Sequence, residues 1–229
     1  MPVVDLATMT RRDLNQQLHA LEQETNQTHW RVENPNGQHA LAVGLNAPVT
    51  VEIAGHAGYY CAGMNMQATV IVEGNAGVGV AENMMSGLVH VRGDASQSAG
   101  ATAHGGTLVI DGNASARCGI SMKGVNIIVK GSIGPMSAFM AQSGTLVVLG
   151  DAGDDLGDSI YEARLFVRGS VGSLGADCIE KPLRDEHLSE LRELIAVAGL
   201  DETVRPEDFR RFGSARKLYN FHVDNANAY

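Results

Sequence analysis

The sequence predicts an all-β protein: a single-stranded, right-handed parallel β-helix of about seven coils with short α-helical flanks. Two observations predict this fold. Glycine recurs every 19 residues without a slip, and an alternation typical of a half-buried strand precedes each of these glycines. A period of 19 is too short for a βαβ unit of about 30 residues, but it fits one coil of a solenoid. We therefore expect an N-terminal helix and capping segment in 1–48, the β-helix in 49–182, and C-terminal helices with a docking tail in 183–229.

The bulk composition is that of a globular protein, with 44% hydrophobic and 19% charged residues. A net charge of −9 argues against nucleic acid or an anionic membrane surface as the main partner. The first residues lack the basic and then apolar pattern of a signal peptide. The three cysteines form no CxxC pair, which favours a reducing compartment. We therefore expect a cytoplasmic protein.

The N-terminal segment contains one predicted helix. Thr10 and Asp13 are spaced like a capping box, and Leu14, Leu18 and Leu21 then share one helical face. The stretch HALAVGL, residues 39–45, is expected to form a strand that caps the open end of the solenoid.

The glycine repeat defines the coils. Residues two and four positions before each glycine are Val, Ile or Leu, and the residue seven positions after it is always Ala or Gly. We interpret the glycines as corner residues, where a positive φ or close packing disfavours a side chain. The corner glycines are Gly55, Gly74, Gly93, Gly112, Gly131, Gly150 and Gly169.

The stretch TVIVEGNAGVG, residues 69–79, also has the look of a phosphate-binding turn. Such a turn needs a helix after the loop, whereas here another coil follows. The corner interpretation is therefore preferred. Because the period of 19 lacks the hexapeptide rhythm of left-handed β-helices, we expect the right-handed form.

Two outward columns of the repeat carry further information. Glu73, Arg92, Asp111 and Lys130 alternate in sign on successive coils, which disfavours a slip in register. Another outward column becomes apolar in its later coils, at Ile128, Val147 and Phe166. A sheet that is apolar on both faces is normally covered on both. Either the chain's own flank or another subunit covers this candidate interface.

The C-terminal flank predicts two helices and a tail. Residues 186–199 have a helical apolar stripe ending at Gly199, and residues 205–213 suit a second helix that starts at Pro206 and stops at Gly213. The tail then supplies side chains that either anchor a partner or fold back on the rod. These candidate interface residues are Arg216, Lys217, Leu218, Tyr219 and Phe221.

No motif for catalysis is present. His56, His90 and His104 fall in different columns, and the cluster Asp154, Asp155 and Asp158 fits a solvated loop better than a cation site. Cys61 and Cys118 share a column three coils apart, roughly 14 Å, which is too far for a disulfide. We therefore expect two reduced core cysteines and no catalytic, cofactor-binding or metal-binding residue.

The repeats VIVEGNAG, VHVRGDAS, LVIDGNAS, IIVKGSIG and LVVLGDAG resemble the GXGXG β-helix domain at the C-terminus of the glutamate synthase large chain, over about residues 40–185. With the ending RRFGSARKLYNF, the chain is most similar to the stand-alone β-helix subunit of N-methylglutamate synthase. The resemblance implies a scaffold without catalytic residues, in a complex that makes N-methylglutamate from methylamine and glutamate.

The resemblance also implies the partners: a class II amidotransferase-like subunit and a glutamate-synthase-like subunit that holds FMN and an iron–sulfur cluster, with no cofactor on this chain. The same β-helix occurs as a subunit of formylmethanofuran dehydrogenase, which leaves that complex or another glutamate-synthase-type complex as an alternative. A self-assembling structural β-helix is a further alternative.

Overall fold

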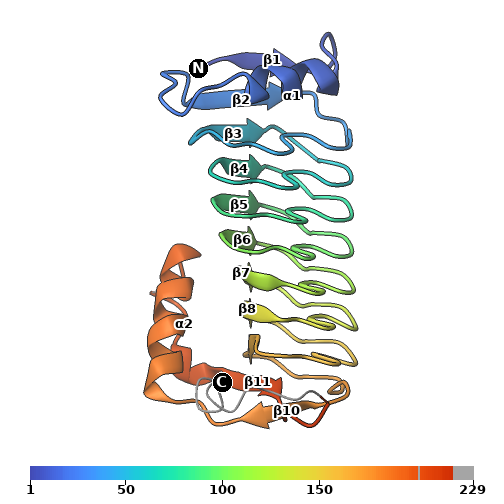
Figure 1. The fold of residues 1–229 in the computed structure, drawn as a ribbon, viewed down its shortest axis with the longest axis vertical. Coiled ribbons are helices and arrows are strands. Elements are labelled where there is room, and N and C mark those ends of the chain that lie inside the picture. The colour runs from blue at the N-terminus through green and yellow to red at the C-terminus, as the bar shows by residue number, and fades with distance from the viewer. Residues whose placement is uncertain (201, 219–229) are drawn as a thin grey trace.

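The computed structural model describes residues 1–200 and 202–218 and confirms the predicted β-helix of about seven turns. One parallel strand per coil stacks on the next with a register of 19 residues, so that Val51 pairs with Val70 (Figure 1). The repeating strands are β3 (Thr50–Ile53), β4 (Thr69–Val72), β5 (Leu88–Val91), β6 (Thr107–Ile110), β7 (Lys123–Val129), β8 (Ser143–Val148) and β9 (Arg164–Val167).

The solenoid interior is one continuous apolar cluster. The inward residues two and four positions before the corner glycines are fully buried from Val51 to Val167, as the alternation predicted. Cys61 and Cys118 are free and buried, and burial raises the pKa of each thiol to about 12. Both cysteines are thus small core residues held as neutral thiols.

After six of the seven corners, the small residue seven positions on adopts left-handed backbone, with φ between +54° and +69°. These residues are Ala62, Ala81, Gly100, Gly119, Ala138 and Gly157. Each also donates its N–H to the preceding coil, as Ala81 does to the Cys61 carbonyl at 2.9 Å. Left-handed backbone costs residues with a side chain about 1–2 kcal/mol. At Gly100 an added Cβ would also lie 2.5 Å from Ile127 Cδ1, so the crowded interior limits this column to small residues.

At the corner glycines, steric contact with the preceding coil is the main reason why a side chain does not fit. Of the seven, only Gly55 has a positive φ in the glycine-favouring range, at +148°. At Gly112 an added Cβ would lie 2.3 Å from Asp94 Oδ1 and 2.9 Å from the backbone carbon of Gly93. At the six corners after Gly55, close packing of one corner on the next excludes a side chain, whereas the backbone conformation would allow one.

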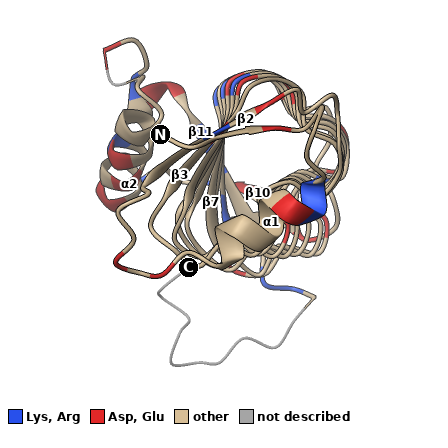
Figure 2. Cartoon of the chain, turned by 90° about the horizontal axis from the view of Figure 1, so that it is seen from above, with Lys and Arg blue, Asp and Glu red and all other residues tan. Residues whose placement is uncertain are grey.

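The N-terminal segment contributes β1 (Val3–Asp5), α1 (Arg11–His19) and β2 (His29–Glu33). Helix α1 begins at the predicted capping box, in which Thr10 Oγ1 accepts the Asp13 N–H and Asp13 Oδ2 accepts the Thr10 N–H. Its Leu14 and Leu18 join the solenoid core. Figure 2 shows α1 lying over the end of the solenoid.

The prediction of a strand at 39–45 was wrong, because these residues form turns. Ala40, Ala42 and Gly44 have left-handed backbone like the equivalent positions of later coils. The N–H of Ala40 bonds to the Tyr59 carbonyl at 2.7 Å. Together with β2, which pairs with β3, this segment builds a further coil ahead of residue 49.

The C-terminal flank consists of β10 (Cys178–Lys181), α2 (Asp185–Val197), a single 3₁₀ turn η1 (Pro206–Asp208) and β11 (Arg210–Ser214). Helix α2 and its end at Gly199, with φ +69°, match the prediction. The second helix predicted over 205–213 was wrong. Strand β11 inserts antiparallel between β9 and β10, and this pairing buries Phe212 in the solenoid core, which outweighs local helix propensity.

Over the described ranges 1–200 and 202–218, no helix combines the length and apolar character needed to cross a membrane.

Candidate interaction surfaces and the C-terminal polar network

The predicted interface residues Ile128, Val147 and Phe166 are fully buried, and α2 covers them. They form a second apolar cluster with Leu191 and Ile195 of the helix. Figure 1 shows α2 running alongside the later half of the stack. Of the two alternatives for covering this column, the chain's own flank is correct, and these three residues are not open to a partner.

No helix of the described chain lies over the earlier part of the same face. Ile71 and His90 are only half-buried there. Glu52 pairs with Arg31 of β2 at 3.3 Å. The outward face therefore divides into a covered apolar part and a mixed part that remains accessible.

In the described part of the tail, hydrogen bonds hold the backbone of Arg216 and Lys217, and Lys217 and Leu218 are exposed. The Arg216 N–H donates to Ser214 Oγ at 2.9 Å, and the Lys217 N–H donates to Asp177 Oδ1 at 3.0 Å. The Leu218 side chain is 53% exposed. Tyr219 and Phe221 lie outside the described residues.

Exposed methionines mark another surface of the solenoid. Met64, Met66, Met85 and Met140 are each about two-fifths exposed, between 39% and 45%. Met66 and Met85 lie 19 residues apart and so occupy equivalent places on adjacent coils. Methionine is flexible and polarizable, and is common where a surface adapts to a partner.

The alternating charge column forms ion pairs centred on Asp111. Its carboxylate lies 2.8 Å from Lys130 Nζ, 2.9 Å from His90 Nε2 and 3.6 Å from Arg92 Nη1. Burial alone would raise the pKa of Asp111, but the hydrogen bonds from Lys130 and His90 bring it below its ordinary value. These contacts link successive coils, as the alternation of charge predicted.

The residue after each corner glycine has a role that the sequence reading missed. Its side chain accepts the backbone N–H of the equivalent residue on the next coil, at 2.7–3.0 Å in all six steps. The acceptors are His56 Nδ1, Asn75 Oδ1, Asp94 Oδ1, Asn113 Oδ1, Ser132 Oγ and Asp151 Oδ1. From the sequence, Asn, Asp and Ser in this column indicated only turns. Their strict 19-residue spacing was the signal that could have predicted this ladder of hydrogen bonds between coils, called the corner ladder below.

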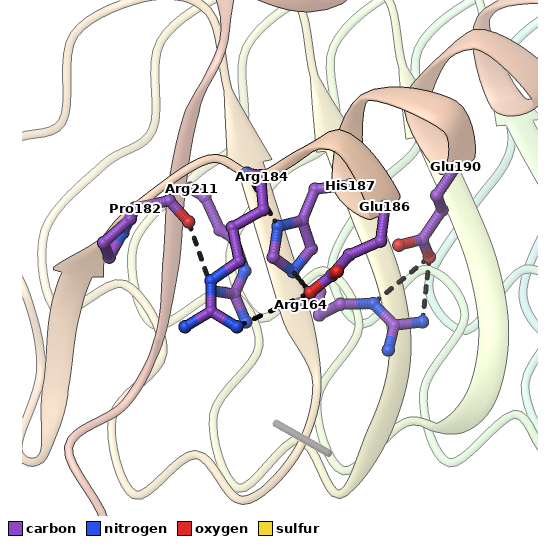
Figure 3. A network of polar contacts seen from close by, with 7 residues as sticks. All are labelled: Arg164, Pro182, Arg184, Glu186, His187, Glu190 and Arg211. Carbon is purple, nitrogen blue, oxygen red and sulfur yellow. Dashed lines mark hydrogen bonds and ion pairs between the residues drawn. The ribbon is translucent and has the colours of Figure 1, made fainter. Parts of the chain in front are cut away.

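A polar network fastens α2 to the sheet (Figure 3). Glu190 of α2 accepts hydrogen bonds from Arg164 Nη2 at 2.8 Å and Thr145 Oγ1 at 2.6 Å. Thr145 lies on β8 and Arg164 on β9, so one carboxylate ties the helix to two coils. The ion pair is partly buried, which makes it less screened than a surface pair.

Arg211 of β11 and His187 of α2 are both buried near the start of α2. Arg211 and His187 are each 5% exposed. His187 Nδ1 accepts the backbone N–H of Arg184 at 3.1 Å. Burial, and then the charge of Arg211, lower the pKa of His187, so its neutral form is favoured. Burial also lowers the pKa of Arg211, together with the neighbouring Arg164 and Arg184.

Of the three aspartates near residue 155, Asp158 forms side-chain hydrogen bonds within its coil and to the next coil. Asp158 accepts hydrogen bonds from Ser159 Oγ at 2.7 Å and from the Ala176 N–H at 3.1 Å. Within the described residues, no group of three or more His, Cys, Asp or Glu side chains is arranged to hold a metal ion.

The chain is 64% identical to Protein GlxC of Rhizobium meliloti (strain 1021) over 229 residues, which is 100% of both chains. No family model matches the chain.

Proposed function

The chain belongs to the family of Protein GlxC, and from this premise we propose that it is a non-catalytic scaffold subunit of a glutamate-synthase-like multisubunit enzyme. The observation that carries the proposal is the repeat itself. The 19-residue pattern that resembles the glutamate synthase β-helix runs without interruption from β3 to β9. Its regular spacing serves strand stacking, the corners and the hydrogen bonds between coils.

The reaction we propose for the complex is that of N-methylglutamate synthase: methylamine and L-glutamate give N-methyl-L-glutamate and ammonia. In this proposal an amidotransferase-like subunit and a subunit with FMN and an iron–sulfur cluster carry the chemistry. This chain holds them in register for transfer of ammonia or methylamine. The proposal rests on the resemblance of the repeat and of the ending RRFGSARKLYNF.

A laddered solenoid suits this role physically. Each coil is joined to the next by strand pairing, by the corner ladder and by the left-handed segment, so the distance between two docking points is fixed by the number of coils between them. A scaffold needs such a fixed separation, because misplacement by 1 Å can cost a reaction about 100-fold.

The accessible docking elements are the exposed methionines and the tail. Met66 and Met85 lie on adjacent coils, and Leu218 follows a backbone that Asp177 fixes. We propose that the tail, including Tyr219 and Phe221, binds a partner subunit. A truncation that removes 218–229 keeps β11 intact, because that strand ends at Ser214.

The experiment is co-purification of the tagged full chain from its source cell, with partners identified by mass. The assembled complex is then assayed for formation of N-methyl-L-glutamate and release of ammonia from L-glutamate and ammonia-free methylamine. The proposal expects two co-purifying subunits, yellow colour in the complex, and a colourless isolated chain. Stoichiometric FMN on the isolated chain would contradict the scaffold role. A complex that makes glutamate or oxidises a formyl group instead would keep the scaffold role but reject the reaction.

The truncated chain provides the second arm of this test. Removal of 218–229 is expected to abolish co-purification while the melting temperature changes by less than about 2 °C. The matched control is Val197→Ser, which alters an equally exposed apolar side chain, 57% accessible, on α2. If the truncated chain still co-purifies both partners, the tail is not the docking element.

A further inference from the structure

Among the described residues, no anion matches the buried charge of Arg211. It lies on the outward face of β11, paired in register with Phe166 and Lys181. The residue is 5% exposed, and its Nη1 donates to the Pro182 carbonyl at 3.4 Å. Its buried Nε finds no hydrogen-bond partner in residues 1–200 and 202–218. A buried guanidinium is costly unless it is paired and fully hydrogen-bonded.

In the part of the chain that the structure describes, the neighbouring charges do not supply the missing anion. Arg164, Arg184 and Lys181 add positive charge around Arg211. Of the two nearby carboxylates, Glu190 is already engaged by Arg164 and Thr145. Glu186 is 67% exposed in its side chain and makes only long contacts, 3.6 Å to Arg184 and 3.9 Å to His187. The cluster therefore has an excess of positive charge.

The start of α2 adds backbone donors to this cluster. The helix has 13 residues, and Arg184 at its N-cap makes no side-chain hydrogen bond to the first turn, whose acidic side chains are Asp185 and Glu186. The N-terminus of a helix carries roughly half a positive charge and favours anions. Figure 3 shows Arg211 and Arg184 together beside this turn.

We propose that Arg211, Arg184 and the first turn of α2 form a binding site for an oxyanion, of the carboxylate or phosphate type. Such a group would accept the unused Nε–H of Arg211, and its planar or tetrahedral oxygens suit the guanidinium fork. Arg184 is the entry point, because its side chain is 62% exposed and its pairing with Glu186 is long enough to be exchanged. The site fastens the helix start to the terminal strands β10 and β11.

The test is thermal unfolding of the full chain with inorganic phosphate, with acetate, and with chloride at matched ionic strength and pH 7.5. The site predicts a rise in melting temperature of at least 2 °C with phosphate or acetate over chloride, which saturates with concentration. A response to phosphate alone identifies a phosphate site, and a response to acetate alone identifies a carboxylate site. Equal melting temperatures in all three salts would overturn the proposal.

Two variants test whether the anion-dependent rise in melting temperature requires Arg211. Arg211→Met keeps the apolar volume but removes the guanidinium, and the anion-specific rise should disappear. The matched control is Arg210→Met on the same strand, an exposed arginine paired with Glu180 at 3.4 Å, which should keep the rise. If Arg211→Met does not fold, Arg184→Met decides: the proposal expects at least a tenfold weaker apparent affinity, and an unchanged affinity would overturn it.

Discussion

Asp94 accepts both the backbone N–H of Asn113, at 2.7 Å, and its side-chain Nδ2–H, at 3.2 Å, across two adjacent coils. Asn113 then accepts the N–H of Ser132 at 2.9 Å on the coil after that. Asp94 and Asn113, which both have high turn propensity, thus also accept hydrogen bonds from the next coil. Because the ladder runs along the solenoid, it opposes any change in register between coils.

Asp94→Ala should lower the free energy of unfolding by about 1–2 kcal/mol, since a hydrogen bond to a charged acceptor is worth about 1.5–3 kcal/mol net and this one is exposed. Asp94→Asn retains an acceptor and should lose less than half of that. Urea denaturation measures both. Gln97→Ala, exposed on the same coil, is the control and should stay within about 0.5 kcal/mol of the parent.

Gly112→Ala should destabilise the protein by more than about 1 kcal/mol, because the new Cβ would lie 2.3 Å from Asp94 Oδ1 and 2.9 Å from the Gly93 backbone. The matched control is Gly213→Ala, where the nearest atom to the new Cβ is Lys181 Cδ at 3.4 Å. Thermal melts of the two variants test the corner assignment. Equal losses at both sites would mean that alanine itself, and not corner packing, is responsible.

Phe166→Ala should cost about 3–5 kcal/mol, the usual range for a buried phenylalanine. Phe166 belongs to the cluster under α2 and not to the solenoid core. The substitution should therefore destabilise the packing of α2 more than that of the early coils. Hydrogen exchange should show faster exchange in Asp185–Val197 with little change in β3 to β5. Uniformly faster exchange through all coils would show that α2 and the solenoid unfold as one unit.

The stability of α2 should depend on pH through His187. Its folded pKa lies below the ordinary 6.5 because of burial and then Arg211, opposed by Glu186 and Glu190. The unfolded histidine therefore takes up a proton at a higher pH than the folded one. The stabilisation is complete above about pH 6.5 and declines as pH falls from there towards the folded pKa.

His187→Gln keeps an acceptor for the Arg184 N–H but cannot titrate. The parent-minus-variant difference in unfolding free energy, measured from pH 8 to pH 5, should be flat above pH 6.5 and then fall. The subtraction removes the contribution of the other histidines and carboxylates. A difference that rises below pH 6.5 would mean that the folded state favours the charged imidazole.

The solenoid could be predicted from the sequence because each coil contacts only its neighbours and repeats the same steric requirement. Each coil places the same steric demand on the same column, so the corner glycines and the small left-handed column recur at Gly112 and Gly119 as they do elsewhere. Helix α1, with its capping box at Thr10 and Asp13, was also predicted, since capping depends on residues three apart. The buried cysteines followed from the same periodicity.

The flanks were harder, because long-range packing decides them. Residues 205–213 have the local signals of a helix, yet β11 gains more by pairing with β9 and β10 and burying Phe212. Nothing local shows that α2 folds back over Ile128 and Val147. The unpaired charge of Arg211 depends on segments around Arg164, Arg184 and Arg211 itself, which meet only in the folded chain.

The sequence by itself determined the coil: its period, its inward face and the places where a side chain does not fit, because a repeated unit contacts only its neighbours. Only the tertiary structure decided which surfaces remain open and where charge is left unbalanced. Those properties depend on how the two flanks pack against the solenoid. The packing buries apolar side chains of α1, α2 and β11 that are far apart in the sequence from the residues they contact.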